Sequence, residues 1–90
     1  MNIIGKTDNG VSVVDGVFFL QTSVGLPLGI IVEELKDHNC IPAWDQYIID
    51  ALDGGWFGPT IYATLIQQGL PIREIQRTMV AILADYQYDD

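Results

Sequence analysis

The residue types that could carry catalysis or bind a metal are few in this chain, and His38 and Cys40 are the clearest of them. They are the single histidine and the single cysteine of the 90 residues, and they lie two positions apart. A zinc site needs three or four ligands at set spacings, and a nucleophilic thiol needs a separately placed base. The sequence supplies neither set, and it has no glycine-rich phosphate-binding loop. We therefore expect no bound metal, no cofactor and no enzyme activity.

Acidic side chains are the other chemically distinctive group, and they are unevenly distributed. Twelve Asp and Glu residues against four Lys and Arg residues give a formal net charge of −8. Six of the acids, against one lysine, lie within residues 33–57. A charge of this size repels phosphate groups and anionic lipid and attracts basic surfaces. The expected partner is therefore a basic protein, and binding to nucleic acid or to a membrane is disfavoured.

Three of these acids share one side of a predicted helix that begins after Pro42 and ends at about Asp53. At about 100° per residue, Asp45, Asp50 and Asp53 fall within an arc of about 140°, with Ile49 set among them. An anionic surface with an apolar contact point suits a basic partner. The alternative interpretation is a helix face that is only exposed to solvent.

The aromatic pair Trp56 and Phe57 follows this helix, between Gly54-Gly55 and Gly58-Pro59. Both rings cannot easily point inward from so short a loop, and Trp is enriched at binding hot spots. Residues 54–72 also carry no charged side chain, and an apolar surface on a small protein usually marks an interface. We therefore expect Trp56 and Phe57 to contact a partner or to lie in a two-fold homodimer interface.

Residues 60–84 resemble a helix-turn-helix, because two helical segments are joined by the short turn Gly69-Leu70-Pro71. The second helix would expose Arg73, Gln76 and Arg77, which are residue types that contact bases in the major groove. The resemblance implies a DNA-binding regulator. The first helix carries no basic residue, however, and much of the affinity for duplex DNA is electrostatic. DNA binding is therefore the alternative function.

The elements that must position these residues predict an α+β fold in a single domain of residues 1–90. Turn sequences at residues 8–10 and 15–16 separate three apolar segments, which predicts a small three-stranded antiparallel β-meander over residues 1–21. The third strand of the meander would be residues 17–20. From residue 26 to residue 86 the apolar residues recur at helical spacing, which predicts four short α-helices.

The same features indicate a compartment and a class of function. A lone cysteine and an N-terminus unlike a secretory signal favour a reducing cytoplasm. In composition and size the chain is similar to phage-encoded inhibitors of host defence, such as anti-CRISPR proteins and DNA mimics. That similarity implies a small acidic inhibitor that binds a basic or nucleic-acid-handling protein. The DNA-binding regulator is the first alternative, and an assembly or chaperone subunit of a larger particle is the second.

Overall fold

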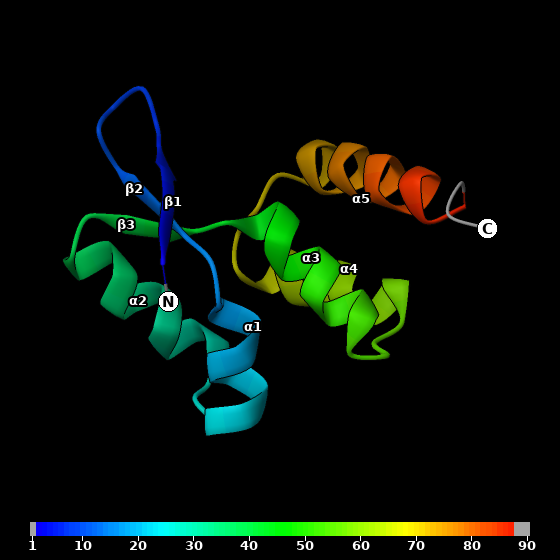
Figure 1. Ribbon diagram of the computed structural model, residues 1–90, viewed down its shortest axis with the longest axis horizontal. Helices are drawn as coiled ribbons and strands as arrows, with labels where there is room; N and C mark the ends of the chain where they lie inside the picture. Colours follow the sequence, from blue (N-terminus) through cyan, green and yellow to red (C-terminus); the bar gives the residue numbers. More distant parts are fainter. Residues whose placement is uncertain (1, 88–90) are drawn as a thin grey trace. The chain divides into compact units, whose positions relative to one another are not determined.

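The protein combines a three-stranded sheet with five α-helices, and the computed structural model describes residues 2–87 (Figure 1). The elements are β1 (Ile3–Lys6), β2 (Ser12–Val14), α1 (Val17–Phe19), the π-helix η1 (Leu20–Val24), α2 (Leu28–Asp37), β3 (Cys40–Pro42), α3 (Trp44–Asp53), α4 (Gly58–Gln67) and α5 (Ile72–Gln87). Contacts along the chain divide it into two compact units, residues 1–47 and residues 48–90, which are described in turn. The mixed α+β class is confirmed.

The first two strands form the predicted antiparallel hairpin. Ile3 pairs with Val14 and Lys6 pairs with Ser12, and the register shifts between Ile3 and Gly5. The turn is closed by the Thr7 amide, which donates to the carbonyl oxygen of Val11 at 2.8 Å. Local turn chemistry therefore specifies this part of the sheet.

The third strand of the sheet is not the predicted one. β3 lies beside β2 and runs parallel to it, with Val13 opposite Ile41, so the sheet order is β1-β2-β3. The expected all-antiparallel meander within residues 1–21 is therefore wrong in its last strand. A parallel neighbour needs a long crossover connection. Residues 15–39 provide it, through α1, η1 and α2.

Residues 17–20, predicted as a strand, are helical instead. Gly16 adopts a left-handed conformation with φ of 81°, which turns the chain out of β2. The Leu20 amide then donates to the carbonyl oxygen of Gly16 at 3.2 Å, closing a helical turn. A short apolar run without alternation is compatible with a buried strand and with a helical segment. The wrong choice between them also explains why a helical segment appears beyond the four that were expected.

The core of the first unit lies between α2, the sheet and the start of α3. The buried residues of α2 are Leu28, Ile31, Val32 and Leu35, which is the helical spacing that the sequence predicts. α2 runs alongside β3, as Figure 1 shows. The ring of Tyr47 meets Phe18 and Trp44 edge to face, with centroid distances of 5.6 and 5.5 Å. Its hydroxyl donates to Oε1 of Gln21 at 2.5 Å. The side chain of Tyr47 therefore connects α3 to the segment after β2, through its ring contact with Phe18 and its hydrogen bond to Gln21.

The second unit consists of the rest of α3 together with α4 and α5. α3 ends where Gly54-Gly55 predicts, because the amides of Gly55 and Trp56 donate to the carbonyl oxygens of Leu52 and Ala51 around a left-handed Gly55 with φ of 88°. The buried residues of this unit are Ile48, Ala51, Ile61, Leu65, Ile75, Met79 and Ile82. All four predicted helices therefore occur. Within residues 2–87, no helix is both long and apolar enough to cross a membrane.

Candidate functional site

The three predicted carboxylates of α3, Asp45, Asp50 and Asp53, are called here the acidic face. All three belong to one ten-residue helix, so they keep the predicted helical spacing and extend over about 12 Å of its axis. Asp45 and Asp53 are exposed and Asp50 is half-buried. Ile49, predicted to lie among them, is also half-buried. The helix therefore offers to solvent both the charge and part of the apolar contact point.

The electrostatics of α3 differ between its two ends. Asp45 lies in the first turn, where a negative charge is favourable, and its Oδ1 accepts a hydrogen bond from the Gln46 amide at 2.9 Å. Asp50 and Asp53 lie in the last turn, which holds no basic residue. Acids at that end oppose the helix dipole and cost roughly 0.3–1 kcal/mol each at low ionic strength. The helix dipole therefore favours a carboxylate at Asp45 and disfavours one at Asp50 and at Asp53.

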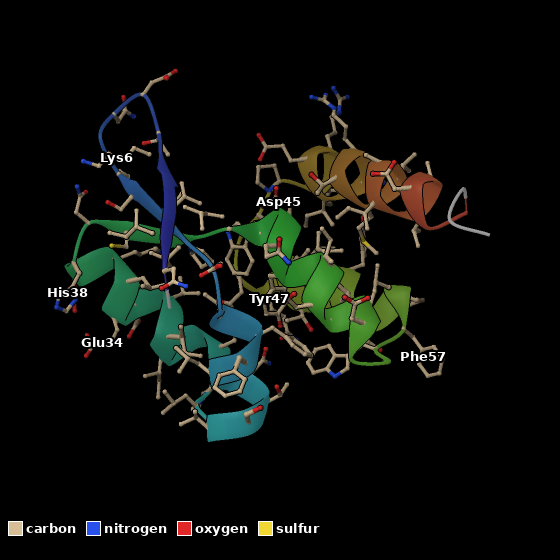
Figure 2. The ribbon with its side chains drawn as sticks, in the orientation of Figure 1. Lys6, Glu34, His38, Asp45, Tyr47 and Phe57 are labelled. Atoms are coloured by element: carbon tan, nitrogen blue, oxygen red, sulfur yellow. The ribbon has the colours of Figure 1, made fainter. Side chains whose placement is uncertain are left out.

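The aromatic pair after α3 is divided between interior and solvent. Trp56 is half-buried, whereas the side chain of Phe57 is 78% exposed, more than any other large apolar side chain described. Phe57 precedes the first turn of α4, and Figure 2 shows its ring pointing away from the turn that joins α3 to α4. The expectation that both rings cannot point inward therefore agrees with the placement of Phe57. A surface of this kind is an available anchor for a partner.

The residues of the alternative site are exposed along one helix. Arg73, Gln76 and Arg77 lie in the first half of α5, and all three are exposed. The turn between α4 and α5 contains Gly69 with φ of 83°, a left-handed conformation that glycine adopts readily. Exposed Glu74 lies next to Arg73, and α4 holds no basic residue. These charges give duplex DNA little to bind beyond two arginines.

The side chains of His38 and Cys40 each lie at hydrogen-bond distance from a main-chain oxygen. The imidazole Nδ1 lies 2.9 Å from the main-chain oxygen of Glu34, while the Cys40 thiol donates to the main-chain oxygen of His38 at 3.3 Å. The thiol is therefore directed to a carbonyl oxygen, which cannot take its proton. Among residues 2–87, no group of three or more His, Cys, Asp and Glu side chains is arranged to hold a metal ion.

A concave site in the first unit is one that the sequence did not predict. It is an apolar groove of about 330 Å³ between η1, the loop that follows it and α2. Its lining residues are Leu20, Leu26, Ile30, Ile31, Glu34, Leu35 and His38. The sequence contains one signal for it: Ile30 lies off the buried stripe of α2 and is 53% exposed.

Tyr47 is the buried aromatic residue of the first unit whose side chain titrates. Burial raises the pKa of the Tyr47 phenol from 10.0 to about 12, and the hydrogen bond to Gln21 opposes that rise. A phenol with this pKa stays neutral at physiological pH. Tyr47 therefore acts as a structural hydrogen-bond donor.

Comparison of the chain with protein families, with curated proteins and with solved structures found no match.

Proposed function

We propose that the protein is a small acidic interaction protein that binds a basic protein partner through the acidic face of α3. The observation that carries the proposal is the placement of Asp45, Asp50 and Asp53 on one solvent-accessible helix face. Asp50 and Asp53 lie in the last turn of α3, where a carboxylate opposes the helix dipole, and the side chain of Asp53 is exposed to solvent. Complementary charge of this kind speeds association and selects the partner.

Phe57 and the half-buried Ile49 supply the apolar part of such an interface. Charged rims contribute chiefly to the association rate, whereas binding energy is concentrated in a few desolvated anchors. Phe57 is exposed and follows Asp53 by four residues, so it is the best placed anchor beside the acids. The same ring can instead be covered by a second copy of the chain in a two-fold dimer.

In the finer form of the proposal, the partner is a nucleic-acid-handling protein of the cytoplasm, and the acidic face covers its basic surface. This is the mode of action of a phage-type inhibitor of host defence, which resembles this chain in size and composition. The activity is non-catalytic and needs no cofactor. Its support is the formal charge of −8 and the exposed carboxylates of α3.

A capture experiment with two matched variants tests the proposal. The immobilised protein is incubated with lysate of the cells that naturally make it, and retained proteins are identified. D45N/D50N/D53N changes the formal charge from −8 to −5, and D8N/E74Q/D85N makes the same change at exposed acids elsewhere. We expect one basic protein to bind the wild type and the second variant but not the first. It should be released at about 0.5 M salt, where screening acts within a few ångströms. Equal capture by both variants would contradict the proposal.

The DNA-binding regulator is kept as a second candidate because Arg73, Gln76 and Arg77 are all exposed on the helix that follows a tight turn. A mobility shift with random duplex DNA and retention on heparin test it directly. Retention that is lost in R73A/R77A would favour the regulator. Absence of both signals at about 50 mM salt, where phosphate contacts are strongest, would remove it.

A further inference from the structure

The apolar groove of the first unit has the size and lining of a binding site. Its volume of about 330 Å³ lies at the lower end of the range of small ligand pockets, about 300–1,000 Å³. Leu20 and Leu26 form one wall, while Ile31 and Leu35 belong to the buried stripe of α2. The groove is assembled within residues 20–38 of one compact unit.

The groove is open to solvent along its length. Leu26 and Ile30 both line it, yet their side chains remain 40% and 53% exposed. A small-molecule ligand in its binding pocket is normally buried over most of its surface. Apolar side chains that stay this exposed around a groove suit a polypeptide instead, because a polypeptide can cover the rim as well as fill the centre.

The polar end of the groove selects the charge of the occupant. Glu34 lies in α2 and His38 is the residue that follows the end of this helix, and their side chains are 70% and 74% exposed (Figure 2). Nδ1 of His38 faces two oxygens of Glu34, the main-chain oxygen at 2.9 Å and Oε2 at 3.8 Å. A carbonyl oxygen only accepts, so Nδ1 is the donor in the contact with the main-chain oxygen. The exposed carboxylate of Glu34 gives this rim a negative charge, which favours a cationic occupant.

We propose that this groove binds an amphipathic basic helix of a partner protein, with its apolar side chains against Leu26 and Ile30 and a Lys or Arg at Glu34. Helix-in-groove recognition uses apolar anchors at i, i+3, i+4 and i+7. Residues 16–32 contribute no charge to the groove, while α2 exposes Glu33, Glu34 and Asp37 against one Lys36. The inference takes the basic class of partner from the proposed function and assigns to η1 and α2 a second contact, separate from the acidic face of α3.

Two synthetic peptides probe the groove directly. The first carries leucine at helical i, i+3, i+4 and i+7 positions and lysine elsewhere, and the second replaces every lysine with glutamate. Each is titrated into the ¹⁵N-labelled full-length protein. We expect the leucine–lysine peptide to shift the amide signals of Leu26, Ile30 and Leu35 in a saturable way, and the leucine–glutamate peptide to shift none of them. Equal shifts with both peptides would overturn the basic identity of the occupant.

Paired variants locate the site. Ile30→Lys should weaken the leucine–lysine peptide by about tenfold or more, the size of effect expected for an anchor residue. Ile72→Lys makes the same change on α5 at a nearly equal exposure, 51%, and should leave the affinity within about twofold. Glu34→Gln should weaken the peptide by about threefold. Unchanged circular dichroism in all three variants shows that the fold is intact.

The remaining outcomes separate this inference from the proposed function. Binding that D45N/D50N/D53N abolishes and Ile30→Lys leaves intact would place the peptide on α3, which overturns the groove and spares the proposed function. Binding lost only in Ile30→Lys supports the groove, whatever the capture experiment shows for α3. If n-decylammonium shifts the amide signals of the groove in a saturable way and the leucine–lysine peptide does not, the groove is a small-molecule site. If the amide signals of Leu26, Ile30 and Leu35 shift when the protein alone is concentrated, the occupant of the groove is a second copy of the chain. Either of these results overturns the inference.

Discussion

Replacing Tyr47 with Phe tests how the first unit is held together. The substitution keeps the ring and its edge-to-face contacts with Phe18 and Trp44 and removes only the hydroxyl, which donates to Gln21 at 2.5 Å. A net hydrogen bond contributes about 0.5–1.5 kcal/mol, and the half-buried Gln21 oxygen regains only part of its solvation. We expect Tyr47→Phe to lower the free energy of unfolding by about 1 kcal/mol near pH 7.

The pH dependence of this difference is the sharper part of the prediction. The pKa of Tyr47 rises from 10.0 to about 12 because the side chain, only 2% exposed, is desolvated. The unfolded chain therefore loses the phenol proton first. The stabilisation is complete below about pH 10 and is lost as the pH rises toward about 12. By about pH 11 the wild type should have lost about 1 kcal/mol of stability, a loss that the variant cannot show because it has no phenol at position 47.

Urea denaturation of both proteins at matched pH values measures the effect. The other tyrosines and the lysines titrate in both proteins, so the difference between the two free energies isolates Tyr47. The wild type should be the more stable protein near pH 7, and the two should become about equal near pH 11. A difference that stays constant across this range would show that the phenol is not desolvated in the folded protein, and the account of the first unit would be refuted.

Three further predictions follow from the backbone and the surface. An added Cβ would meet no atom within 4 Å at Gly29 or at Gly55. In urea denaturation, Gly29→Ala in α2 should raise the free energy of unfolding by about 0.4–1 kcal/mol. Gly55→Ala should lower it by about 1 kcal/mol. The sign differs because Gly55 has φ of 88°, and equal effects would contradict the assigned turn. Sedimentation should show a dimer near twice 10.0 kDa that Phe57→Asp converts to a monomer, and a wild-type monomer at tens of micromolar would exclude the dimer. Cys40→Ser should change neither partner capture nor stability by more than about 1 kcal/mol, since a serine hydroxyl can donate to the same carbonyl oxygen of His38.

Much of the fold is predictable from the sequence because it is specified locally. Turn residues define the first hairpin, and helical spacing with Gly and Pro punctuation places the helices that begin near residues 28, 44, 58 and 72. The third strand is not specified in this way. Cys40–Pro42 is only three residues long and pairs with a strand some 28 positions earlier in the chain. Such a pairing leaves no periodic signal, whereas residues 17–20 carry an ambiguous one.

The two candidate sites also differ in how far the sequence predicts them. The acidic face depends on the spacing of Asp45, Asp50 and Asp53 within one helix, and the sequence alone predicts that spacing. The apolar groove depends on bringing Leu20 and Leu26 against Ile30 and Leu35, across a π-helix and a left-handed Gly25. Neither the π-helix nor the direction of the chain after it follows from residue types alone. The groove therefore depends on the path of the backbone between η1 and α2, which the residue types do not specify.

The most direct test of the central claim is the association rate of the captured basic partner with the protein, measured by stopped flow over a series of salt concentrations. The three carboxylates of the acidic face steer the encounter, so D45N/D50N/D53N should slow association by about tenfold at low salt and flatten the salt dependence. D8N/E74Q/D85N, with the same formal charge of −5, should keep a rate and slope close to those of the wild type. Both variants should melt near the wild-type temperature. If D45N/D50N/D53N associates with the wild-type rate and salt slope, the acidic face is only a solvated surface of α3, and the proposed function is contradicted.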